Sequence, residues 1–447
     1  MAITKRIYPT YPTINHNVSQ SIYPEYYTCT SDDNSYSDFK YKFELYTTDG
    51  LVNTSMNPAL IDEGLGVYNA NKFIQNEFDV YFNPEITTWN AIPDGDSMIQ
   101  YYVNVEEYSV DIAAPDNESF TKVIAIKNSV EGWNYLDYVL NDTDKHMLTN
   151  HSDITLELSL NDVATKRFLN GAMVHGTAGT SFTQGNNSLV NQITMTVTKP
   201  TGWIHYYRFR TSNPYYNYST TAMSSGDQTL ESMLGRMLDF PVGPKQIMAM
   251  KWDYVGNTSP AGVYTGYSYP YSLNLNTLEV DDEYTIQSYT WPYGTNGRTS
   301  YPYKFKVVDE CSSRDRILLS WETQLGGFDY FIMDRKSDKV NSISKSHFRK
   351  VRDSVTSDYD YTHDVYDRGE TTYHTKIDTN YIVVSDWVTD EEVLYLEDLF
   401  YSKNVFARID DIWYPIILTN DTVMVNSSRK QLRNYTIDFR LSNKKYI

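Results

Sequence analysis

Stretches in which apolar and polar residues alternate recur along much of this chain. Residues 154–160 read ITLELSL, so Ile154, Leu156, Leu158 and Leu160 lie on one face of an extended segment. Alternation with a period of two places one face of a strand against a core and the other in water, as in antiparallel sheets. Similar alternation is found at 122–127, 193–199, 204–210, 303–308 and 434–441. The pattern predicts a mainly β chain with antiparallel, sandwich-like or barrel-like domains.

A capping box predicts one helix near 389–401. The Thr389 side chain can accept a hydrogen bond from the backbone of Glu392, whose own side chain can reach back to Thr389. The apolar residues that follow at spacings of three and four are Val393, Leu396, Leu399 and Phe400. The same kind of spacing predicts short helices near 59–63 and 228–238.

Turn-forming residues stand between several of the alternating stretches. Pro200-Thr201-Gly202 predicts a β-hairpin between the stretches that end at 199 and begin at 204. Gly326-Gly327 predicts another, because glycine tolerates the positive φ of a tight turn. We expect Trp321 and Phe328, on either side of this turn, to pack in the core, and Trp387 to seat the helix near 389–401.

The length of 447 residues corresponds to two or three domains. We divide the chain into an extended N-terminal arm at 1–30, a β-rich region at 31–244, a Tyr-rich loop or connector region at 245–306, and a C-terminal β-domain with one helix at 307–447. Three prolines exclude a regular helix from the first segment. Its aromatic residues favour docking on a neighbouring subunit over a free terminus.

Aromatic residues make up 15% of the chain, and 41 residues are tyrosine. Aromatic side chains fit half-buried sheets, and tyrosine adds a polar tip that can face water or a partner. This composition therefore favours a β-rich protein with wide interaction surfaces.

The formal net charge is −19, and most of it lies in the first 250 residues, which hold 15 basic and 28 acidic residues. Such a chain has no general affinity for nucleic acid or for an anionic membrane. It can still form the wall of a channel through which DNA slides, although solubility alone also explains the charge. In this acidic chain, residues 334–352 form a basic run, which we interpret as a solvated loop. Its alternative role is an electrostatic contact with an acidic neighbour, such as another copy of the chain.

The sequence contains no motif that carries known chemistry. It lacks the zinc-binding HExxH pattern, phosphate-binding glycine loops and the GxSxG nucleophile elbow. His146 and His151 have the wrong spacing for one helical face, and Cys29 and Cys311 form no CxxC pair. The Asp/Tyr stretch at 358–367 lacks the spacing of an EF-hand. We therefore expect a protein that is not an enzyme, with no catalytic residues, no cofactor and no metal site.

No secretory signal is expected at the N-terminus, because no apolar stretch follows its basic residues. No apolar run approaches the roughly 18 residues of a membrane span, so we expect no membrane insertion.

One ordered set of sequence elements lies in the last third of the chain. Its members are Arg314–Trp321, Leu325–Phe331, Tyr381–Val388, the helix that ends in Leu399–Val405, Tyr414–Leu418 and the alternating stretch at 434–441. This set resembles a module of tail proteins from phages that infect Bacteroidetes, including the crAss-like phages with short tails. The resemblance covers roughly residues 307–447, and residues 1–245 take no part in it.

The resemblance implies a virion protein of the phage tail, synthesised in the host cytoplasm. It implies a ring, hub or adaptor subunit around the DNA channel, whose partners are about six or twelve copies of itself and neighbouring ring, portal-side or fibre proteins. It implies no catalytic residues and no specific binding of nucleic acid. Two alternatives stay open: a receptor-binding or carbohydrate-binding tail protein, and a polysaccharide depolymerase of the same tail.

Overall fold

The structure is a computed structural model of the full chain. It describes residues 3–5, 26–31, 38–47, 49–60, 64–87, 90–91, 98–112, 115–120, 123–126, 154–170, 190–210, 236–266, 272–274, 278–290, 300–309, 316–324, 326–349, 354–355, 361–362, 370–420, 433–443 and 445–446. The chain divides into two compact units. Unit 1 comprises residues 1–310 and 322–329, and unit 2 comprises 311–321 and 330–447.

Two antiparallel sheets share an aromatic core in the first part of unit 1. One is formed by β1 (Ile3–Lys5), β2 (Tyr26–Ser31) and β5 (Leu65–Asn69), and the other by β4 (Gly50–Pro58), β3 (Lys40–Thr47), β7 (Met98–Tyr108), β8 (Asn117–Ser119) and β9 (Val123–Ile126). Tyr27, Phe43 and Tyr68 from both sheets are buried in one cluster, which α1 (Asn71–Glu77) joins through Ile74. The arrangement follows from strict alternation, because the inward positions of β3 are all apolar.

A close approach of backbone and ring fixes the Tyr41 side chain in this core. The Tyr41 hydroxyl donates to the Gly64 carbonyl at 2.7 Å and accepts from the Ser31 backbone N–H at 2.8 Å. A Cβ atom at Gly66 would lie 2.4 Å from the Tyr41 ring, so only glycine fits there. Burial raises the pKa of the Tyr41 hydroxyl, which stays a neutral donor.

A large sheet dominates the second part of unit 1. Its order is β10 (Thr155–Ser159), β19 (Tyr303–Val308), β18 (Glu283–Thr290), β12 (Val190–Thr198), β13 (Ile204–Arg210), β15 (Lys251–Thr258) and β16 (Tyr264–Gly266), with β17 (Ser272–Asn274) beside β15. All of these pairs are antiparallel except β10–β19. A smaller sheet of β11 (Thr165–Asn170), β14 (Arg236–Pro241) and β6 (Asn90–Ala91) contributes Phe240, which packs on Trp252 beside the short helix α4 (Pro244–Ala249).

The described residues of unit 2 form one large antiparallel sheet, a pair of short strands and one helix. The sheet order is β21 (Phe328–Met333), β20 (Ile317–Glu322), β26 (Val405–Ile409), β27 (Ile412–Leu418), β28 (Arg433–Leu441), β25 (Glu370–Val388) and β22 (Lys336–Arg349), with β29 (Lys445–Tyr446) beside β25. The short strands β23 (Ser354–Val355) and β24 (Tyr361–Thr362) pair with each other. The helix α5 (Asp390–Tyr401) buries Val393, Leu396 and Leu399.

The prediction of a mainly β chain with antiparallel sheets and a few short helices is confirmed, and the described sheets stay open instead of closing into barrels. The hairpin around Gly202 is confirmed, with Gly202 at φ +83° between β12 and β13. The capping box is confirmed too, since Thr389 accepts from the Glu392 N–H at 3.3 Å. Gly326 has φ +84°, and Trp321 and Phe328 are both buried, as expected.

Several local predictions are wrong. Leu60 forms a β-bridge with Leu65 instead of belonging to a helix at 59–63, of which 61–63 lie outside the described residues. The described end of the helix expected at 228–238 is part of β14, because Leu238 pairs with Phe168 of β11. Trp387 does not seat α5, since it is 54% exposed.

Two expected loop segments are strands instead. The region at 245–306 was expected to be loop-rich, yet it contains strands β15 to β18. The basic run at 334–352 was expected to be a solvated loop, but its residues 336–349 form β22. Both ends of the expected N-terminal arm, β1 and β2, pair with each other in unit 1, and residues 6–25 lie outside the described residues. These segments are strands because they pair with strands that are distant in sequence.

A buried ionic cluster in unit 1 gathers segments that are far apart in sequence. The Arg167 guanidinium forms two hydrogen bonds with the Asp239 carboxylate, at 2.8 and 3.1 Å. It also donates to the Gly326 carbonyl at 3.0 Å and lies over the Phe328 ring, 5.1 Å from its centroid. Beside it, Lys166 pairs with the buried carboxylate of Asp329. All of these groups are buried, so each charge depends on its partner.

Replacing Asp239 by Asn is therefore expected to destabilise unit 1 by about 3 kcal/mol, because it leaves the buried Arg167 charge without its counter-ion. Urea unfolding followed by tryptophan fluorescence measures the change. The matched control is Glu283→Gln, which removes an exposed carboxylate and should change stability by less than about 0.5 kcal/mol. Equal effects of the two substitutions would contradict the role of the pair.

A projecting β-arm and a groove beside helix α5

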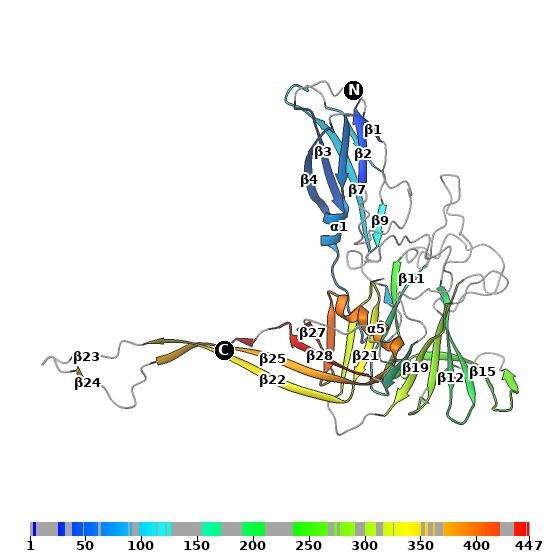
Figure 1. Ribbon diagram of the computed structural model, residues 1–447. Helices are drawn as coiled ribbons and strands as arrows, with labels where there is room; N and C mark the ends of the chain where they lie inside the picture. The colour runs from blue at the N-terminus through cyan, green and yellow to red at the C-terminus, as the bar shows by residue number, and fades with distance from the viewer. Residues whose placement is uncertain are drawn as a thin grey trace. The chain divides into compact units, whose positions relative to one another are not determined.

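The outer part of the β22–β25 hairpin projects from the sheet of unit 2 (Figure 1). We call residues 339–349 and 370–380 the β-arm. The two strands pair along their length, from Lys339 opposite Tyr381 to Arg349 opposite Glu370. No residue of the β-arm is buried, whereas β25 becomes alternately buried from Tyr381 onward. The hairpin therefore consists of an inner part that belongs to the core and an outer part with both faces exposed.

Apolar side chains lie on the β-arm without a core to cover them. Ile343 is 59% exposed and stands directly opposite Ile377. Further out, Phe348 and Tyr373 contact each other edge to face, with ring centroids 6.0 Å apart, at a bulge in β25. Beyond Lys376 and Ile377, where β29 also pairs with β25, the β-arm is a two-stranded ribbon, and such a ribbon is only marginally stable by itself in water. These exposed apolar pairs are consequently the kind of surface that a partner covers.

The β-arm carries a local excess of positive charge. Four of its residues are basic (Lys339, Lys345, Arg349 and Lys376), and two are acidic (Glu370 and Asp378). Lys376 pairs with Asp378 at 2.6 Å, and the Lys339 ammonium lies 5.6 Å from the centroid of the Tyr381 ring. A hydrogen bond with the Tyr381 side chain raises the pKa of Lys339, which favours its charged form. Lys345 and Arg349 lie toward the tip, on an otherwise strongly acidic chain.

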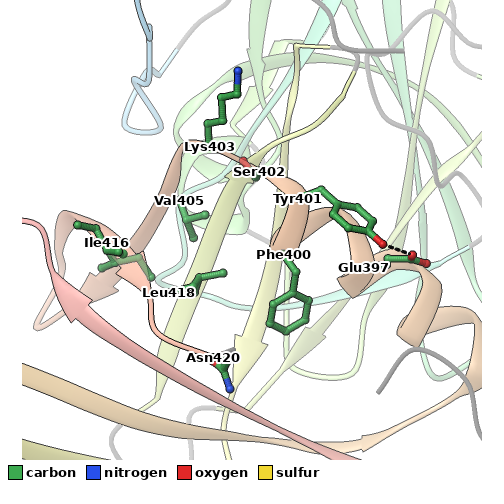
Figure 2. A pocket seen from close by; sticks show the side chains of 10 residues that line it. Glu397, Phe400, Tyr401, Ser402, Lys403, Val405, Ile416, Leu418 and Asn420 are labelled. Atoms are coloured by element: carbon green, nitrogen blue, oxygen red, sulfur yellow. Dashed lines mark hydrogen bonds between the residues drawn. The ribbon is translucent and has the colours of Figure 1, made fainter. Parts of the chain in front are cut away.

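A groove of about 510 Å³ lies beside the C-terminal end of α5 (Figure 2). The residues around it come from α5, β26, β27 and the loops that follow α5 and β27. They are Glu397, Phe400, Tyr401, Ser402, Lys403, Val405, Ile416, Ile417, Leu418 and Asn420. Phe400, Val405 and Leu418 contribute apolar side chains to a groove whose surface is mainly polar. The exposed side chains of Tyr401 and Ile417 extend this apolar surface at the rim.

Helix α5 makes this side of unit 2 acidic. It contains five carboxylates (Asp390, Glu391, Glu392, Glu397 and Asp398) and no lysine or arginine. The Glu397 carboxylate accepts a hydrogen bond from the Tyr401 hydroxyl at 2.8 Å, which raises the pKa of Tyr401. Lys403, which follows the helix, is the one basic group at the groove. Among the described residues, the groove therefore carries one acidic and one basic side chain, Glu397 and Lys403, while the rest of α5 is acidic.

Tyr395 anchors α5 and so positions the groove. Its hydroxyl donates to the Tyr330 carbonyl at 3.0 Å and accepts from the Tyr330 N–H at 3.1 Å. Its ring packs edge to face on Trp321, with centroids 5.1 Å apart. Tyr395 thus takes the role that the sequence had suggested for Trp387.

A row of aromatic rings forms a second surface, on the large sheet of unit 1. Trp203 is 39% exposed and stacks on His205, with ring centroids 6.5 Å apart. His205 Nδ1 lies 3.3 Å from the Tyr254 hydroxyl, and Tyr254 contacts the Tyr207 ring. Burial lowers the pKa of His205, and the nearby Lys199 ammonium lowers it further, so its neutral form is favoured.

The candidates for chemistry in the sequence contribute little to these surfaces. Burial raises the pKa of the Cys29 thiol to about 12, which makes it a poor nucleophile. His146, His151 and Cys311 lie outside the described residues, as does most of the stretch at 358–367. Among the described residues, no group of three or more potential ligands could hold a metal ion. The groove was not predicted from the sequence, although the acidic first turn of α5 was visible in it.

No protein-family model matches this chain, and no curated protein matches it either. In the described part of the chain, no helix has both the length and the apolar character needed to cross a membrane.

The β-arm should contribute little to the stability of the isolated chain. We expect Ile343→Asp to change the free energy of unfolding by less than about 0.5 kcal/mol, because the side chain is exposed. Ile437→Ala should cost about 3 kcal/mol, since Ile437 is fully buried opposite Val383 in the same sheet. Urea unfolding of both variants tests this contrast. A comparable loss for Ile343→Asp would mean that the β-arm is covered within its own chain.

Proposed function

We propose that this chain is a non-enzymatic structural subunit of a bacteriophage tail, in which several copies form a ring or hub around the DNA channel. The observation that supports the proposal is the β-arm, because its exposed apolar and basic side chains are of the kind that a partner covers. The ordered set of sequence elements in residues 307–447 resembles a module of phage tail proteins, and this resemblance is why we propose that the assembly is a phage tail. Neighbouring ring, portal-side or fibre proteins are its further proposed partners.

The charge of the chain is compatible with this role. A net charge of −19 repels the phosphate backbone, so a channel wall built from such subunits would let DNA pass without holding it. No arrangement of described residues calls for an enzymatic function. The proposed location is accordingly the tail of the virion.

The test is to purify the phage that encodes this chain, to identify its virion proteins by mass spectrometry and to image the tail by cryo-electron microscopy. We expect the chain in the tail, in a closed ring of about six or twelve copies, because repeated contacts between two different patches close into rings. A phage that lacks the gene for this chain, propagated on cells that supply it, provides the control. Absence of the chain from intact virions would refute the proposal.

A second candidate function is carbohydrate or receptor binding by a tail protein. The observation that favours it is the row of Trp203, His205 and Tyr254, because partly exposed aromatic faces stack on apolar faces of sugar rings. We rank this function below the structural one, because the structural function also accounts for the β-arm.

Binding of the purified chain to an array of bacterial surface glycans tests this second function. If the aromatic row binds sugar, Trp203→Ala should weaken binding at least about tenfold, the equivalent of about 1.4 kcal/mol. Tyr301→Ala is the matched control, since Tyr301 is similarly exposed and lies outside the row. An array without any signal for the unchanged chain would exclude this function for the glycans tested.

A further inference from the structure

We propose that the β-arm of one copy docks in the groove beside α5 of the next copy. This inference rests on the proposed function, since it names the contact that joins subunits of the ring. It requires that the β-arm cannot fill the groove of its own chain and that the β-arm and the groove are complementary. It also requires that the repeated contact can close into a ring.

The β-arm cannot reach the groove of its own chain. Within unit 2, β25 leads away from the sheet toward β23 and β24, while α5 lies at the opposite, inner end of β25 (Figure 1). From Tyr381 to Glu370 a paired strand extends for roughly 36 Å, at about 3.3 Å per residue. Continuous pairing with β22 keeps this ribbon extended. Only another molecule can therefore bring a groove to its outer part.

The two surfaces have opposite charge. Lys345 and Arg349 lie in the outer part of β22, whereas α5 carries five carboxylates, of which Glu391 is exposed and Glu397 lines the groove. Opposite potentials steer two surfaces together and favour one orientation over others. The β-arm carries four basic and two acidic residues, so its charge is opposite to that of α5.

Both surfaces also carry apolar side chains. The β-arm presents Ile343, which shares a face with Lys345 and Arg349 because side chains alternate along a strand, and the groove offers Phe400 and Leu418. A volume of about 510 Å³ is within the range of roughly 300–1,000 Å³ that is typical of ligand pockets. Several side chains of the β-arm can therefore be buried in it, which removes exposed apolar surface from both copies.

The contact joins two different patches and is therefore heterologous. Each copy offers one β-arm and one groove, so every copy can bind a neighbour on either side. Such a head-to-tail contact closes into a ring when the rotation between copies allows it. A ring of this kind leaves no β-arm without a groove.

Reversed charges on either surface test the contact. The arm variant carries Lys345→Glu and Arg349→Glu, and the helix variant carries Glu391→Lys and Glu397→Lys. Sedimentation velocity at low salt, with the full chain, measures self-association. We expect each variant alone to associate at least about tenfold more weakly than the unchanged chain, because like charges then face each other. A mixture of the two variants should regain association, since each reversed β-arm meets a reversed helix and each original β-arm meets an original helix.

The matched control is Lys245→Glu with Lys304→Glu, which reverses two exposed lysines of unit 1 and changes the net charge as much as the arm variant does. It should associate like the unchanged chain. Thermal unfolding of all variants shows whether they fold, and the recovery in the mixture is itself evidence that both do.

Three results would overturn the inference. They are variants that associate like the unchanged chain, a mixture that does not recover, and an unchanged chain that stays monomeric at all concentrations. None of these touches the proposed function, which depends on the presence of the chain in the virion tail. A chain that is absent from virions but passes the charge-reversal test would instead refute the proposed function and leave the contact established.

Discussion

A guanidinium group that has lost its water must be surrounded by acceptors, and in unit 1 this requirement ties distant parts of the chain together. Arg167 on β11 reaches Asp239 on β14, the carbonyl of Tyr81 and the carbonyl of Gly326 in the turn between β20 and β21. Each of these acceptors lies at least 72 residues away in sequence. In the neighbouring ion pair, the buried charges of Lys166 and Asp329 likewise neutralise each other. Because an unpaired buried charge is so costly, these segments are held in one arrangement.

The turn that supplies the Gly326 carbonyl connects β20 and β21. The residues before the turn include Trp321, on which Tyr395 of α5 packs. The glycine turn, the ionic cluster around Arg167 and the contact between Trp321 and Tyr395 therefore all involve residues in the short segment 321–329. A change in this stretch is expected to affect more than its own strand pair.

Strand β25 shows how one element can serve both stability and interaction. From Tyr381 to Val388 it alternates with buried residues and belongs to the core, while its outer residues are covered on neither face. Burial supplies the free energy that orders the inner part, and the pairing with β22 extends that order outward. In the proposed contact, a ribbon held in this way would be ordered before docking, which would lower the entropy cost of docking. The groove beside α5 is equally fixed, through the two hydrogen bonds between Tyr395 and Tyr330.

The sequence by itself determined the features that depend on neighbours along the chain. Alternation predicted β10, β12, β13, β19 and β28, the glycine turns predicted two hairpins, and the capping box at Thr389 predicted α5, because all three signals act within a few residues. Only the tertiary structure decided that residues 236–238 are a strand and that 336–349 form half of the β-arm, since their partners lie about 70 and 35 residues away. It also decided that Trp387 is exposed while Tyr395 anchors the helix, and it assembled the groove from α5, β26 and β27. Long-range pairing and burial are properties of the whole fold, and no short window of sequence contains them.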